Sequence, residues 1–321
     1  MLGHGNRLRG TLHGRLQQCG RCRCQSDGGG GRSDGRSGRN FLSPATLRLL
    51  QALQTRTMQE AEVREMLAPE LARWRPGQAT QILSDLKAAG KPEVALDVLR
   101  AMRAARVAVN VFHYIAGMSA CSRTNQWTTA LGLLHDLMHH DAGAMNSIAY
   151  NNGITACEKG GQWQCALHLL KQMALQAVVP NTVSYSAGIS ACSKVGQWLI
   201  ALYLLSEMSR KGISRNAITY NAAISACEKG GQWQVALLLL AEMSAQSVPK
   251  TNVTYNASIS ASEKAGQWRV ALHLLGQMAR TGVRKDSVTF SASISACEKG
   301  IRWQLALDLL EAWRRIRFCG I

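Results

Sequence analysis

Six basic side chains recur along the chain at a nearly constant spacing of 35 or 36 residues. They are Arg123, Lys159, Lys194, Lys229, Lys264 and Lys299. If the intervening chain folds the same way each time, these cations line up along one edge, where they can contact the phosphates of a polyanion. Cations are also favoured at helix C-termini, so a structural role for the basic ladder stays open. An acidic residue precedes four of them, at Glu158, Glu228, Glu263 and Glu298, and reduces their net field.

The whole chain of 321 residues shares this basic bias, because 37 Lys and Arg face 20 Asp and Glu and give a formal net charge of +17. A surface this basic attracts polyanions or anionic lipid headgroups, and nucleic acid is the first candidate. The apolar run around 237–240 is soon interrupted by Glu242, and no apolar run in the chain approaches the ~20 residues that span a bilayer. We therefore expect no membrane insertion.

Cysteines offer a second kind of chemistry, and five of the ten occupy one equivalent position. They are Cys121, Cys157, Cys192, Cys227 and Cys297. At this spacing they form no CxxC pair, and Ser262 takes the same position once, so we expect free, buried thiols in a reducing compartment. Cys19, Cys22 and Cys24 contain one CxxC, but without a second pair or a His cluster we expect no metal site there.

Tryptophan marks the repeating unit that positions these residues. Trp127, Trp163, Trp198, Trp233, Trp268 and Trp303 follow one another at spacings of 36, 35, 35, 35 and 35 residues. The predicted units are 76–110, 111–146, 147–181, 182–216, 217–251, 252–286 and 287–321, and the first is degenerate, with Pro92 at the Trp position. Self-similarity at a fixed period is the signature of a repeat architecture. We expect the Trp side chains to fill the gaps between neighbouring units rather than to stack on bases.

Each unit has the pattern of two short amphipathic helices. In the unit 217–251, apolar residues recur at helical spacing on both sides of Gly230 and Gly231, which predict a left-handed C-cap for the first helix. The predicted N-caps are the polar residues at unit starts, Ser147, Thr182, Asn252 and Ser287. A hairpin of ~35 residues cannot bury its apolar faces alone, so we predict an all-α fold, a right-handed α-solenoid of stacked helical hairpins.

The unit resembles the pentatricopeptide repeat in two motifs, Val-Thr-Tyr-Asn at 253–256 and Ala-Leu-x-Leu-Leu-x-x-Met at 271–278. The resemblance covers 76–321. Tetratricopeptide repeats share the hairpin but run at 34 residues with a different consensus. The resemblance implies a groove lined by first helices, in which each repeat reads one base of single-stranded RNA.

In that family the fifth and last residues of a unit hydrogen-bond a base edge. The resemblance assigns this role to Thr80 with Asn110, Asn151 with Asn181, Ser186 with Asn216, Asn221 with Thr251, and Asn256 with Asp286. All are short and polar, although capping by the last residue and solvation of the fifth is the alternative interpretation. The family preferences would be A, C or U, A, a pyrimidine and U, read 5′ to 3′ along the chain. Ile115 with Asn146, and Ser291 with Ile321, depart from the pattern and are not expected to specify a base.

The resemblance also implies that the second residue of each unit wedges between bases. These residues are Phe112, Ile148, Val183, Ile218, Val253 and Val288. Apolar side chains suit stacking on bases, but a plain core position would have the same residue types. The sequence leaves these two interpretations open.

The segment 1–44 is rich in Gly, Ser and Arg and poor in acids, and nothing in it predicts a core. It has the composition of a transit peptide or of a disordered basic arm that contacts RNA non-specifically. Because the family is chiefly organellar, we favour a mitochondrial or plastid location over a cytoplasmic one. The segment 45–75 is helical in pattern, and we expect it to cap the first repeat.

The function predicted from these features is sequence-selective binding of single-stranded RNA in organellar RNA processing, stability or translation. Enzymes of the family carry a deaminase-like zinc domain or a metal-dependent nuclease domain. The chain shows no HxE with a following CxxC, no carboxylate cluster and no Gly-rich phosphate loop. We therefore expect no catalysis and no cofactor, in a monomer that binds RNA and, as further partners, RNA-processing proteins. The alternative is a scaffold that holds a protein partner in the solenoid groove.

Overall fold

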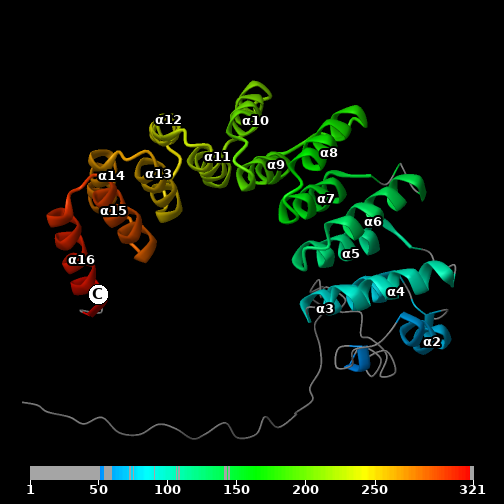
Figure 1. Cartoon of the computed structure of the whole chain (residues 1–321). Helices are drawn as coiled ribbons and strands as arrows, with labels where there is room; N and C mark the ends of the chain where they lie inside the picture. Colours follow the sequence, from blue (N-terminus) through cyan, green and yellow to red (C-terminus); the bar gives the residue numbers. More distant parts are fainter. Residues whose placement is uncertain are drawn as a thin grey trace, which may run out of the picture. The chain divides into compact units, whose positions relative to one another are not determined.

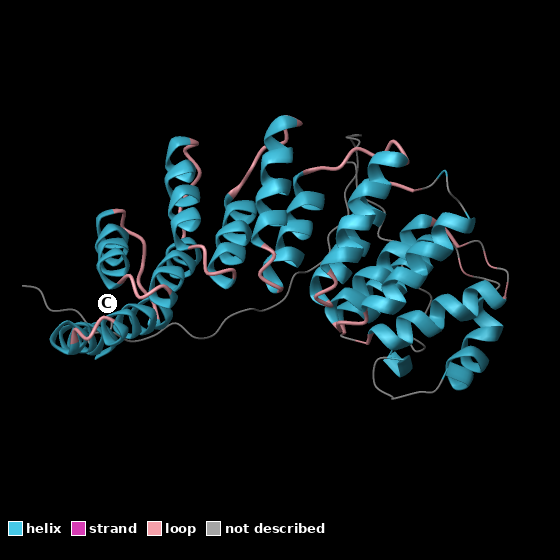
Figure 2. Cartoon of the chain, turned by 45° about the horizontal axis from the view of Figure 1, so that its top comes forward, coloured by secondary structure: helices cyan, strands magenta, loops and turns pink. Residues whose placement is uncertain are grey.

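The computed structural model describes residues 51–53, 60–71, 74, 76–89, 91–105, 107, 109–140, 143 and 145–318. Within these residues the secondary structure is helix and loop, without a strand (Figure 2). The prediction of an all-α solenoid is confirmed, because helical hairpins follow one another in chain order and each packs on the next. The predictions for 1–44, including those for Cys19, Cys22 and Cys24, lie outside the described residues.

Seven hairpins run from α3 to α16, after the separate helix α2 (Glu60–Leu71) (Figure 1). The first helices are α3 (Pro76–Ala88), α5 (Val111–Arg123), α7 (Ser147–Lys159), α9 (Thr182–Lys194), α11 (Ala217–Lys229), α13 (Asn252–Lys264) and α15 (Ser287–Lys299). The second helices are α4 (Pro92–Ala104), α6 (Trp127–His140), α8 (Trp163–Leu175), α10 (Trp198–Arg210), α12 (Trp233–Ala245), α14 (Trp268–Arg280) and α16 (Trp303–Phe318). Thus each first helix starts with its unit, and from α6 on each second helix starts at the recurring Trp.

The first helices form a closely packed row. Each first helix from α5 to α13 packs against the first helix before it and the first helix after it. From α6 on, each second helix packs on its own first helix and, up to α14, on the first helix of the next hairpin, rather than on the next second helix. In a curved solenoid the row with the closer spacing lies on the concave side. Helix α2 packs on α4, and its Val63 and Leu67 join the core of the first hairpin.

The core repeats with the unit. The fourth residue of each first helix from α5 on is a buried aromatic, namely Tyr114, Tyr150, Tyr185, Tyr220, Tyr255 and Phe290. Trp127 packs across a unit boundary, since a Cβ built on Gly160 would lie 2.4 Å from its ring. The prediction that Trp fills gaps between units is confirmed for Trp127 and, through the equivalent approach to Gly230 and Gly300, for Trp198 and Trp268. Trp303 on the last helix is 65% exposed.

The prediction of the N-caps was displaced by one residue. The N-caps are not Ser147, Thr182, Asn252 and Ser287, which are already helical, but the preceding residues Asn146, Asn181, Thr251 and Asp286. Their extended backbone lets the side-chain oxygen accept N–H groups of the first turn. The predicted left-handed glycine after the first helix is confirmed. It is Gly231, at φ 71°, whereas Gly230 keeps a φ of −80°.

The buried Tyr150 hydroxyl has no hydrogen-bond partner among the described residues, and its burial raises the tyrosine pKa. Phe290 occupies the equivalent position without a hydroxyl. Because an unsatisfied buried hydroxyl costs about 1–3 kcal/mol, we expect Tyr150→Phe to leave the urea unfolding midpoint unchanged or to raise it. Circular dichroism of the full chain measures that midpoint.

The matched control is Tyr185→Phe, because the Tyr185 hydroxyl accepts a hydrogen bond from Lys211 Nζ at 2.9 Å. Its loss is expected to lower the free energy of unfolding by about 1 kcal/mol. Equal destabilisation by the two substitutions would show that the Tyr150 hydroxyl does have a partner.

Candidate nucleic-acid interface

The fifth residue of a unit and its last residue meet on the surface of the first-helix row. Asn256 Nδ2 donates to both carboxylate oxygens of Asp286, each at 3.1 Å. Asn151 Nδ2 donates to Asn181 Oδ1 at 3.4 Å. In the same way, Asn221 Nδ2 donates to Thr251 Oγ1, also at 3.4 Å. The three asparagines are half-buried, so the side chains keep an exposed edge.

A hydroxyl from the third residue of the next unit joins each of these pairs. Ser184, Thr254 and Thr289 donate to the Oδ1 atoms of Asn151, Asn221 and Asn256 respectively, each at 2.6 Å. The sequence analysis missed this position. A signal was present, because each of these Asn residues is followed 33 residues later by Ser or Thr. In the unit of 36 residues, the equivalent residue after Ile115 is Ala149, 34 residues later.

The last residue of each pair is also an N-cap, as the alternative interpretation expected. Asn110, Asn181, Asn216, Thr251 and Asp286 all accept backbone N–H groups of the following first helix. Capping uses the side-chain oxygen as an acceptor, so the amide nitrogen of an Asn cap is a separate donor. Capping and base contact are therefore chemically compatible in the same side chain.

Two predicted pairs differ from these three. Ser186 is 9% exposed, and its hydroxyl donates to the backbone oxygen of Thr182 at 2.6 Å. Thr219, the third residue of the next unit, donates to the backbone oxygen of Asn216 at 2.7 Å rather than to Ser186. Thr80 lies half-buried on α3, and Asn110 caps α5 through the backbone N–H of His113 at 3.2 Å. The bridge from third to fifth residue is thus present at Asn151, Asn221 and Asn256 and absent at Ser186.

Asp286 carries a charge at this surface. Burial alone would raise its pKa, but hydrogen bonds from Thr289, Asn256 and Asn252 outweigh burial and lower the pKa below the usual value for Asp. The side chain is therefore a carboxylate at neutral pH and can only accept hydrogen bonds.

The second residues form an exposed apolar row on the first helices. Their side chains are between 53% and 62% exposed, at Phe112, Ile148, Val183, Ile218, Val253 and Val288. This exposure excludes a core position for them. The core position of each of these helices is taken by the buried aromatic residue two positions later. Six equivalent exposed apolar side chains beside the polar pairs could contact the faces of bases.

The basic ladder ties neighbouring first helices together. Lys264 Nζ lies 2.8 Å from Glu228 Oε1 and Lys299 Nζ lies 2.5 Å from Glu263 Oε1, each pair linking consecutive units. Lys229 Nζ donates to the backbone oxygen of Lys194 at 3.2 Å. The six basic residues all end first helices and so lie along one edge, but these three lysines are engaged within the fold.

The recurring cysteines are free, buried thiols, as predicted. Burial raises the pKa of Cys157 to about 12 and that of Cys192 and Cys227 to about 11, which leaves them protonated at neutral pH. Among the described residues no group of three or more His, Cys, Asp or Glu side chains could hold a metal ion. In the same part of the chain no helix has the length and apolar character that crossing a membrane requires.

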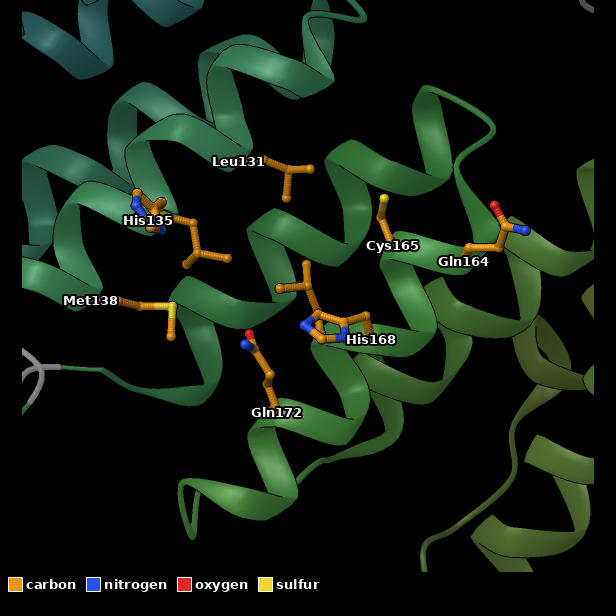
Figure 3. Close-up of a pocket in the computed structure, with 9 residues that line it drawn as sticks. Leu131, His135, Met138, Gln164, Cys165, His168 and Gln172 are labelled. Atoms are coloured by element: carbon orange, nitrogen blue, oxygen red, sulfur yellow. The ribbon is translucent and has the colours of Figure 1, made fainter.

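A cavity of about 590 Å³ lies on the other row, between the second helices α6 and α8 (Figure 3). It lies beside the one unit of 36 residues, and Leu131, Met138, Cys165, His168 and Leu169 belong to its lining. No Lys or Arg lines it, so it offers no counter-charge to a phosphate. The candidate interface is therefore the first-helix row.

Comparisons with known proteins agree on one architecture. Residues 180–229 match the model of the PPR repeat family, and residues 218–248 and 253–283 match the PPR repeat. The structure is similar to that of the pentatricopeptide repeat protein PPR10 from maize, with a TM-score of 0.61 and 23% identity over 84% of this chain and 42% of that one. It is also similar to PPR10 in complex with an 18-nt psaJ RNA element, with a TM-score of 0.64 and 25% identity over 84% of this chain and 38% of the other. No curated protein sequence matches the chain.

The thiols give a direct test of this packing. We expect a brief pulse of N-ethylmaleimide to label half-buried Cys165 at least about tenfold faster than Cys157. Burial of Cys157 blocks access of the reagent and, by raising the thiol pKa, keeps the sulfur from forming the reactive thiolate. Peptide mapping by mass spectrometry separates the two sites. In denaturant the two rates should converge, and equal rates in the native protein would contradict the buried position of Cys157.

Proposed function

Because the chain is a pentatricopeptide repeat protein, we propose that it binds single-stranded RNA along the first-helix row and reads one base with each complete polar pair. The observation that carries the proposal is the joining of fifth and last residues at one partly exposed surface, beside six exposed apolar side chains. A net charge of +17 supplies the attraction for the RNA backbone. The chain spans about two fifths of the length of PPR10.

The unit 252–286 illustrates how a pair would select a base. Asp286 can only accept a hydrogen bond, and the Asn256 amide nitrogen can only donate. The complementary base edge has a ring N–H beside a carbonyl oxygen. Uracil has this arrangement at N3 and its neighbouring oxygens, whereas cytosine and adenine have an acceptor at the corresponding ring nitrogen. The pair therefore favours U over C and A, in agreement with the family preference.

The exposed apolar row would hold each base in place while its edge is read. A base stacked on the side chain of the second residue loses rotational freedom, so its edge faces the fifth and last residues of the unit. Lys229 and Lys264, although engaged within the fold, add positive charge at one edge of the first-helix row. Their attraction for RNA phosphates would not depend on the RNA sequence.

The biological role that we propose is non-catalytic and lies in organellar RNA processing, stability or translation. A protein that covers a short RNA segment can mask a site, block a nuclease or recruit RNA-processing proteins. Monomeric binding suffices for this, because consecutive hairpins of one chain supply all the polar pairs.

Removal of one pair should relax base choice at one position. The probe is a single-stranded RNA of sequence 5′-A-N-Y-A-Y-U-N-3′, varied at the U. We expect Asn256→Ala with Asp286→Ser to reduce discrimination between U and C there from about 5-fold or more toward none, since one mismatch costs ~1–3 kcal/mol. The serine retains an N-cap for α15. Fluorescence anisotropy at several salt concentrations measures the affinities.

The matched control is Asn146→Ser, in the unit where Ile115 is not expected to specify a base. It should leave base choice unchanged at every position. Absence of RNA binding by the wild-type chain, or affinity that does not fall with salt, would contradict the proposed function.

The apolar row provides a separate prediction. Val253 is 55% exposed on α13, and Leu199 is 64% exposed on the second helix α10. We expect Val253→Ser to weaken RNA binding on the order of 5-fold through lost stacking. Leu199→Ser removes a comparable exposed apolar side chain from the other row and should leave the affinity unchanged. Equal effects on RNA affinity would argue against a wedging role.

A further inference from the structure

We propose that the third-residue hydroxyls of Ser184, Thr254 and Thr289 are positioning residues, which fix the donor end of the Asn amide in the preceding repeat and so make it select pyrimidines. The inference rests on the proposed function. It assigns part of the specificity of one repeat to a buried residue of the next.

The geometry at all three junctions is the same. Each hydroxyl donates to the fifth-residue Oδ1 at 2.6 Å, and the three side chains are fully buried. Each hydroxyl oxygen also accepts the backbone N–H of the capping residue, at 3.1 Å for Ser184, 3.0 Å for Thr254 and 3.2 Å for Thr289. The backbone therefore holds the hydroxyl from one side. Ser184 and Thr289 also lie within hydrogen-bonding distance of the capping side chain, at 3.1 Å from Asn181 Oδ1 and 2.8 Å from Asp286 Oδ1, so the amide oxygen at 2.6 Å is the nearest acceptor of each hydroxyl.

This contact matters because an Asn amide has two ends of similar shape and opposite function. One end accepts hydrogen bonds and the other donates two. With Oδ1 bound to the buried hydroxyl, Nδ2 gives one hydrogen to the last residue of the unit and retains one for a base. In the unit 252–286 a flipped amide would set Asn256 Oδ1 against the Asp286 carboxylate, two acceptors 3.1 Å apart. The arrangement thus allows a single orientation.

A fixed donor selects a carbonyl oxygen on the base edge. Uracil and cytosine both carry O2 next to the ring nitrogen N3, whereas at the corresponding position adenine has a C2–H group and guanine has an amino group, neither of which accepts a hydrogen bond. The three bridged repeats are those with a predicted preference for C or U, a pyrimidine, and U. The repeat that pairs Ser186 with Asn216 lacks the bridge and has a predicted preference for A.

The chain contains a matched control for the bridge. Thr219 is equally buried and forms the same capping box, with its oxygen accepting the Asn216 backbone N–H at 2.9 Å. Its hydrogen is directed to the Asn216 backbone oxygen rather than to an Asn amide. Thr→Val at position 219 or 254 therefore removes the same capping contact from an equally buried site, but only at position 254 does the lost hydroxyl donate to a base-reading side chain.

The test measures binding of 5′-A-N-Y-A-Y-U-N-3′ RNA in which the base opposite the unit 217–251 is C, U or A. For Thr254→Val we expect the preference for pyrimidine over A at that base to fall about fivefold or more, because the amide of Asn221 can then present either end. Thr254→Ser should restore the preference. Thr219→Val should lower the unfolding midpoint as Thr254→Val does, yet leave base choice unchanged at the position opposite 182–216.

Ser184→Ala provides a second variant with a smaller change in volume, should Thr254→Val fail to fold. It should reduce the pyrimidine preference opposite the unit 147–181. If the wild-type chain discriminates and both hydroxyl-deleted variants retain its discrimination, the positioning role is overturned while RNA binding stands. If the wild-type chain binds none of these RNAs, the proposed function fails and the positioning role fails with it.

Discussion

Each hairpin of this protein can bury its apolar face only against the next hairpin, and the rest of the structure depends on that constraint. A hairpin of ~35 residues has two short helices and too little apolar surface to fold alone. Stacking solves this in one register, with an aromatic side chain buried at the fourth position and Trp127 seated on Gly160 of the following unit. Because the register is fixed by the core, every other position recurs at the same place on the surface.

The same constraint puts the candidate interface at the junctions between hairpins. Asp286, which we propose reads a base together with Asn256, also starts the next helix by capping it. Thr289, which we propose orients Asn256, belongs to that next helix. A complete reading site therefore requires two consecutive hairpins. In this arrangement the stability of the stack and the geometry of base contact use the same hydrogen bonds, so neither can change independently at these positions.

The features that depend on periodicity could be predicted from the sequence. The recurring Trp fixed the unit length, and unit length with apolar spacing was enough to predict paired helices, their stacking and the buried thiols. The pairing of Asn256 with Asp286 came from the family resemblance, and the structure brings those side chains together. Contacts between units were harder to foresee. Lys264 looked like a free cation in the sequence, but it pairs with Glu228 from the preceding unit, 36 residues away. The caps were misplaced by one residue because Ser287 and Asp286 are both good capping residues, and only backbone geometry distinguishes them.

The second residues show why exposure could not be inferred from residue type. Val253 and the buried Tyr255 are two apolar residues of one short helix, and helical periodicity places them about 200° apart around its axis. Opposite sides of a first helix therefore serve different purposes, since one side closes the core and the other remains in solvent. An apolar residue retained at six equivalent exposed positions has no role in the core to explain it. Under the proposed function, its place beside the polar pairs gives the helical stack a surface on which a flat, apolar-faced ligand such as a nucleobase rests while its edge is read.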